Sequence, residues 1–124
     1  MRPSNSVGGY RIYPSSPGQA DAVAIGVAII GQFNEGMDRL NRERELTQRE
    51  QQLIDNLDPN SQIARNYQGL ITVSNRLWQF ALEKQQSLDR AESVGPYTTA
   101  QLGQRLIECA NHWRQLKHQL EEQG

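Results

Sequence analysis

The run from Ala22 to Gly31 contains no polar side chain, and it constrains the fold more than any other stretch. A helix at a protein surface normally has an apolar stripe and an opposite polar face. This run has no polar face, so we expect another surface to cover it. Small residues recur in it at a spacing of one helical turn, which lets a second backbone approach closely. They are Ala22, Ala24, Gly26 and Ala28.

Composition limits the classes of function. Of the 124 residues, 36% are hydrophobic, below the roughly 45–50% of globular chains, so we expect elongated helices around a thin core. The formal net charge is −1 and no basic stripe is present, which argues against nucleic-acid binding. The single cysteine, Cys109, excludes an internal disulfide and fits a reducing compartment, so we expect a cytoplasmic protein.

The apolar run is too short for a membrane span. A bilayer needs roughly 20 apolar residues, about twice the length of this run. A secretory signal also fits poorly, because a stretch with little basic charge precedes the run and no small-residue cleavage site follows it. Insertion at a membrane interface stays open as an alternative.

Residues 1–16 are rich in proline, serine and glycine. Such a segment buries too little apolar area to offset the entropy of ordering, so we expect a flexible N-terminal arm ahead of a helical bundle domain at residues 17–124. Within the arm, Tyr10, Ile12 and Tyr13 have strand-like composition. They are the expected anchors if the arm becomes ordered by adding a strand to the sheet edge of a partner.

The first helix is predicted to run from Pro17 to Leu57. Behind the apolar run, four apolar residues at 3-4-3 spacing form a packing seam. They are Ile30, Phe33, Met37 and Leu40. In residues 41–52 the charges alternate in sign and Leu46 is the only apolar residue, so this part is predicted to be a solvated helix that projects from the body. Two helices divided near residues 32–36 are the alternative, because glycine weakens a helix.

The second helix is predicted to begin at Asp58-Pro59, since the residue before a proline leaves the α region, and to run to about Glu92. Its seam comprises Ile63, Tyr67, Leu70, Ser74, Leu77, Ala81 and Leu88. Further apolar residues lie on other faces, which indicates more than one neighbour. By composition it is therefore the central helix, and Gly69 is a candidate for a close crossing.

The third helix, predicted from about Thr98 to Glu122, has the most regular pattern. Its apolar residues follow 4-3-4-3-4 spacing, which is typical of a coiled-coil or bundle partner. They are Leu102, Leu106, Cys109, Trp113, Leu116 and Leu120. Thr98 and Gln101 have the spacing of a capping box. Together the three helices predict an all-α fold, an elongated three-helix antiparallel bundle or coiled coil.

Candidate metal ligands occur only in the third helix, as Cys109, His112 and His118. Cys109 and His112 could share a metal, but a zinc site needs three or four such ligands. No nucleophile has a base at a suitable spacing, and no phosphate-binding glycine loop is present. We therefore expect no metal, no cofactor and no enzymatic activity.

The Asp58-Pro59 turn between two long helices resembles the helical-hairpin subunits of secretion needles and inner rods, although the third helix departs from that pattern. The leading hypothesis is a structural or adaptor protein that self-associates as a homo-oligomer, or docks into a larger assembly of the virion or secretion-apparatus type. The second hypothesis is a membrane-active protein that inserts residues 20–31. The third is a cytosolic chaperone, immunity protein or inhibitor that binds a partner protein.

The three hypotheses differ in which surface covers the apolar run from Ala22 to Gly31. Burial against the second helix is the first expectation, a contact between subunits the next, and a membrane the last, because alanine and glycine favour close packing more than insertion. The expected interaction residues are Tyr10, Ile12, Tyr13, Ala22, Ala24, Gly26, Ala28, Ile30, Phe33, Met37 and Leu40.

Overall fold

The computed structural model describes residues 17–90 and 92–123, with the side chains of the first helix from Ile25 onward. The predicted features outside the described residues are the arm at residues 1–16 with Tyr10, Ile12 and Tyr13, and the side chains of Ala22 and Ala24. The remaining predicted interaction residues are all described.

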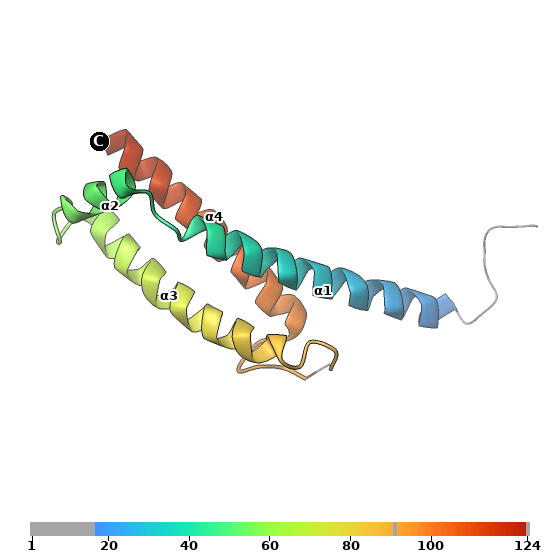
Figure 1. Cartoon of the computed structure of the whole chain (residues 1–124). Helices are drawn as coiled ribbons and strands as arrows, with labels where there is room; N and C mark the ends of the chain where they lie inside the picture. The colour runs from blue at the N-terminus through green and yellow to red at the C-terminus, as the bar shows by residue number, and fades with distance from the viewer. Residues whose placement is uncertain (1–16, 91, 124) are drawn as a thin grey trace, which may run out of the picture.

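Helices account for the regular structure of residues 17–90 and 92–123, apart from an isolated bridge between Val94 and Tyr97. They are α1 (Pro17–Glu43), α2 (Gln48–Asp55), α3 (Gln62–Gln85) and α4 (Thr99–Gln123). The predicted all-α class is confirmed over this part of the chain. Figure 1 shows α1, α3 and α4 as long helices, with the short α2 near the C-terminal end of α4.

The helices are arranged around α4, which contacts the other three, whereas α1 and α3 barely touch each other. Phe33 lies against Gly103, and ten residues later Glu43 pairs with Arg114, so α1 and α4 run in the same direction. The helix α3 runs in the opposite direction (Figure 1). The prediction that the second helix is central was therefore wrong: α4 packs on two sides, because small residues beside its seam admit α1.

The hydrophobic core lies along α4, and the predicted seam of this helix is buried at every position. From α1 the core receives Phe33, Met37 and Leu40, and from α3 it receives Ile63, Leu77 and Ala81. Fully burying a large apolar side chain contributes about 1.5–3 kcal/mol. These seams therefore supply most of the driving force for packing α1 and α3 onto α4.

Helices α1 and α4 pack closely at Gly36 of α1 and Gly103 of α4. A Cβ atom added to Gly36 would lie 2.9 Å from the carbonyl oxygen of Gly103, and one added to Gly103 would lie 3.1 Å from the Cα of Phe33. Gly36 therefore leaves no room for a Cβ atom, whereas a Cβ at Gly103 would require α1 to shift by a few tenths of an ångström. The predicted close crossings at Gly26 and Gly69 were wrong within the chain, because a Cβ at either position meets nothing within 4 Å.

The first predicted helix is divided, but not where the alternative placed the division. Helix α1 passes unbroken through residues 32–36 and ends at Glu43. Helix α2 then begins behind Thr47, whose hydroxyl accepts a hydrogen bond from the Glu50 amide at 3.1 Å while the Glu50 carboxylate accepts one from the Thr47 amide at 2.8 Å. This capping box favours a fresh helix start over continuation, so the single helix from Pro17 to Leu57 was wrong.

The start of the next helix also differs from the prediction. Asp58 caps a turn, because its carboxylate accepts a hydrogen bond from the Asn60 amide at 3.0 Å. Ser61 then takes the N-cap position and accepts from the Ala64 amide at 3.3 Å. Helix α3 therefore begins at Gln62 rather than at Pro59.

The connection between α3 and α4 replaces the predicted end of the second helix at Glu92. Helix α3 stops at Gln85, and the fully buried Lys84 donates hydrogen bonds to the carbonyl oxygens of Arg90 at 2.8 Å and Glu92 at 2.6 Å. Gly95 has a φ of +57°, a backbone conformation that favours glycine. The capping box predicted for the next helix is confirmed, with hydrogen bonds of 3.0 and 3.2 Å between Thr98 and Gln101.

Candidate interaction site

The N-terminal half of α1 extends beyond the rest of the molecule (Figure 1). Phe33 lies beside Gly103, and α4 starts at Thr99, so α4 begins about level with Ile29 of α1. The part of α1 from Pro17 to that level is about 18 Å long at 1.5 Å per residue. We call residues 17–31 the projecting half of α1 and residues 32–43 its packed half.

The described side chains of the projecting half are open to solvent. Ile25 is 59% exposed and Val27 is 67% exposed, and two residues apart on a helix means nearly opposite sides. None of residues 25–31 is buried. The expectation that the second helix covers this run was therefore wrong: α3 ends alongside α4 and does not continue beneath the projecting half (Figure 1).

The packing seam of α1 continues into the projecting half, where no other described element covers it. Ile29 precedes Phe33 by four residues and Gly26 precedes it by seven, so the three share one face of the helix. Phe33 is fully buried, whereas Gly26 and Ile29 are partly exposed. We call Gly26, Ile29 and Ile30 the seam face of the projecting half. Counting back from Phe33 in the sequence could have identified Ile29, which the prediction left out.

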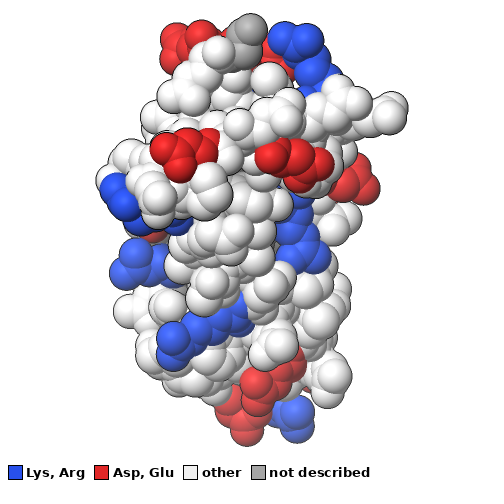
Figure 2. Space-filling view, turned by 90° about the vertical axis from the view of Figure 1, so that its left-hand side faces the viewer, with Lys and Arg blue, Asp and Glu red and all other residues white. Residues whose placement is uncertain are grey.

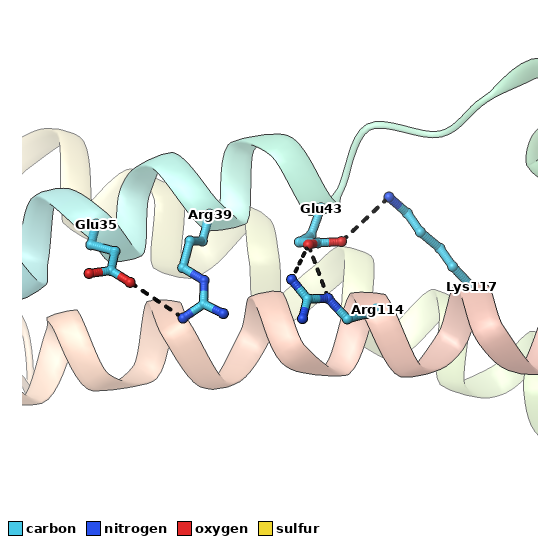
Figure 3. Close-up of polar contacts among 5 residues, drawn as sticks. All are labelled: Glu35, Arg39, Glu43, Arg114 and Lys117. Atoms are coloured by element: carbon cyan, nitrogen blue, oxygen red, sulfur yellow. Dashed lines mark hydrogen bonds and ion pairs between the residues drawn. The ribbon is translucent and has the colours of Figure 1, made fainter.

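The charged end of α1 lies against α4, contrary to the prediction that it projects. Glu43 accepts hydrogen bonds from the Arg114 guanidinium at 2.8 and 3.2 Å, and its other oxygen lies 3.9 Å from the Lys117 ammonium (Figure 3). Arg49 of α2 pairs with Glu121 at 3.2 Å. These cross-helix pairs help to hold the segment onto α4.

Positive and negative side chains are mixed over the end of the molecule where α2 and the C-terminus of α4 lie (Figure 2). No charged residue occurs between Asp21 and Glu35, so the projecting half carries hardly any charge. Exposed ion pairs contribute only about 0.2–1 kcal/mol each, but a charged surface keeps its hydration. Covering the charged end would therefore require removing water from charged side chains, whereas covering the projecting half would mainly bury apolar side chains.

The predicted ligand residues do not gather into a site. Cys109 is buried, and the desolvation raises the pKa of its thiol, opposed by a hydrogen bond with Ser74 at 3.3 Å. Trp113 donates a hydrogen bond to the same Ser74 hydroxyl at 2.7 Å. His112 and His118 are exposed. Within residues 17–90 and 92–123, no three metal-ligating side chains lie together.

A shallow groove of about 480 Å³ lies between α3 and α4, on the side away from α1. Leu70, Val73 and Leu116 supply its apolar lining, and Arg65 and His112 are among the polar residues around it. Val73 is 49% exposed. The groove is open, and its charged and amide lining residues are exposed.

Comparison of the chain with protein-family models, curated proteins and solved structures found no match. Among the helices of the described residues, none is both long enough and apolar enough to cross a bilayer. The candidate site therefore rests on the geometry of this chain alone.

Proposed function

We propose that this protein is a non-enzymatic structural or adaptor protein that self-associates, or docks into a larger assembly of the virion or secretion-apparatus type, through the projecting half of α1. The observation that carries the proposal is the exposure of Ile25 and Val27 on nearly opposite sides of a helical stretch that has no charged residue between Asp21 and Glu35. Burying side chains of this size contributes about 1.5–3 kcal/mol each, which favours a covered state.

As part of this proposal, α1, α3 and α4 form an elongated three-helix antiparallel bundle, because the regular seams of α1 and α4 have coiled-coil spacing. This body acts as a scaffold that holds the projecting half away from its own core. A cytoplasmic location belongs to the same proposal, and the buried free thiol of Cys109 is consistent with it.

A membrane surface is the second candidate partner, favoured by the same apolar helix surface. Alanine and glycine add little to the free energy of insertion, whereas they allow helices to pack closely. We therefore propose a protein surface as the partner of the projecting half. Membrane binding is the alternative outcome of the experiment below.

The test is the native mass of the full chain over a range of concentrations, with and without liposomes of neutral and anionic lipid. We expect the mass to rise with concentration and to be unchanged by liposomes. Gly26→Leu adds a side chain to the seam face, with no atom of the chain within 4 Å of its Cβ. It should weaken self-association at least tenfold without loss of helical circular dichroism.

Gly69→Leu is the matched control, because Gly69 is also a helical glycine with open space around it but lies in α3. We expect it to leave self-association unchanged. A wild-type chain that stays monomeric at all concentrations and binds liposomes would replace the proposal with the membrane candidate. Weaker association in Gly69→Leu alone would move the interface to the groove between α3 and α4.

A further inference from the structure

We propose that the ammonium group of Lys84 is a latch for the connection between α3 and α4. The connection keeps its folded path only while a cation that donates N–H groups lies between the carbonyl oxygens of Arg90 and Glu92. The latch lies within one chain and does not depend on the proposed self-association. It follows from the burial of the charge and from the groups that surround it.

The burial of Lys84 is unusual for a lysine. Its side chain is fully buried, whereas lysine is almost never fully buried unless it is paired. No carboxylate pairs with it in the part of the chain that the structure describes. Its Nζ atom donates instead to the carbonyl oxygens of Arg90 at 2.8 Å and Glu92 at 2.6 Å. Because an ammonium without hydrogen-bond partners is costly to bury, these carbonyl groups are the partners that keep the charge in the interior.

The position of Lys84 at the end of α3 also favours its charge. It is the basic residue of the last turn of this helix, where the free carbonyl groups carry partial negative charge. Beyond it, the Ser87 amide donates to the Lys84 carbonyl at 2.9 Å and the Arg90 amide donates to the Ser87 carbonyl at 3.0 Å. These turns join residues three apart, whereas the ammonium joins the helix end to residues six and eight positions later. The ammonium therefore closes the loop.

The second part of the connection is held by other contacts. Val94 is buried, and its amide and that of Tyr97 donate to each other's carbonyl groups at 2.9 and 3.1 Å. The Tyr97 ring packs edge-on against Phe80 of α3, with ring centroids 5.7 Å apart. Neither contact involves the ammonium. We therefore expect its loss to release the connection next to Arg90 and to leave the helices and the bridge between Val94 and Tyr97 in place.

Cleavage by trypsin after Arg90 tests the latch in the full chain. The carbonyl group of the bond to be cut is one that Lys84 holds, while the Arg90 side chain is exposed. Lys84→Met removes the charge and the N–H donors but keeps an apolar side chain of similar length. Proteolysis tracks the population of the open state, and hydrogen bonds to a charged group are the stronger kind. We therefore expect cleavage after Arg90 to be faster by on the order of tenfold or more, with unchanged helical circular dichroism.

Lys117→Met is the matched control. Lys117 is a lysine of α4 whose ammonium lies 3.9 Å from the Glu43 carboxylate rather than on backbone carbonyl groups. Its replacement should leave cleavage after Arg90 unchanged. Equal acceleration in the two variants would show lower overall stability instead of an opened connection and would overturn the latch. Cleavage of Lys84→Met at the wild-type rate would overturn it as well.

Replacement of the missing atoms by a small ion covers the case in which Lys84→Met loses its helical signal. Lys84→Ala lacks Cγ, Cδ, Cε and Nζ, the atoms that n-propylammonium supplies, whereas tetramethylammonium has the same charge without an N–H group. We expect n-propylammonium alone to slow cleavage after Arg90 toward the wild-type rate, and to restore any lost helical signal. The rate is taken relative to a small arginine peptide cut in the same solution, which corrects for effects of the ion on the protease. Slowing by both ions, or by neither, would contradict the latch.

Discussion

The two halves of α1 belong to one unbroken helix, but only the packed half is buried against the rest of the molecule. The packed half buries Phe33, Met37 and Leu40 against α4 and pairs Glu43 with Arg114. The projecting half is more apolar, yet none of its described side chains is buried. Hydrophobicity alone therefore does not decide which segment is buried, because burial also needs a neighbouring element at the same level of the bundle.

The largest effect should come from truncating one large side chain in each half. Phe33→Ala should lower the free energy of unfolding by about 3–5 kcal/mol, because it leaves a cavity at a fully buried site. Ile25→Ala should change it by no more than about 0.5 kcal/mol at concentrations where the chain is monomeric. Urea unfolding followed by circular dichroism measures both. Equal losses would show that the projecting half is covered within the monomer.

The glycines of α1 should respond with opposite sign. Gly36→Ala forces a Cβ to within 2.9 Å of Gly103 and Leu106, and overpacking of this kind costs about 1–3 kcal/mol. Gly31→Ala meets no atom within 4 Å and should stabilise by up to about 1 kcal/mol, since alanine is the better helix former. Thermal unfolding of the two variants gives the comparison. Stabilisation by Gly36→Ala would contradict the close crossing.

The smallest effect should come from the ion pair that fastens the end of the packed half. Glu43→Gln should lower stability by about 0.5–1 kcal/mol, because the pair with Arg114 is partly screened by solvent. The difference from wild type should shrink in 1 M salt, where the Debye length is about 3 Å. The matched variant Glu35→Gln removes a pair that lies within α1 and should cost less. A loss that does not depend on salt would argue against an electrostatic role.

The sequence predicted the seams well and their partners poorly. Spacing alone correctly located the buried residues of α4 and the buried Phe33, Met37 and Leu40, because helical periodicity is a local property. It could not choose among Gly26, Gly31 and Gly36 for the close crossing, since that choice depends on the register of α1 against α4. The capping box at Thr47 and Glu50 was readable in the sequence and would have ended the first helix correctly.

The sequence and the structure draw attention to the same stretch for different reasons. The run from Ala22 to Gly31 was expected to need a cover, and the charged residues 41–52 were expected to project. The structure reverses the second expectation because Glu43 and Arg49 find partners on α4. Those partners lie some seventy residues away in the chain, beyond the reach of any local pattern.

The crossing at Gly36 and Gly103 has a consequence for the reach of the molecule. Because neither glycine has open space for a Cβ atom at this crossing, the crossing fixes the register of α1 along α4. A shift of one helical turn at this point would lengthen or shorten the free end by about 5.4 Å. The position of two glycines in the body thus sets how far the apolar end of α1 extends beyond α4.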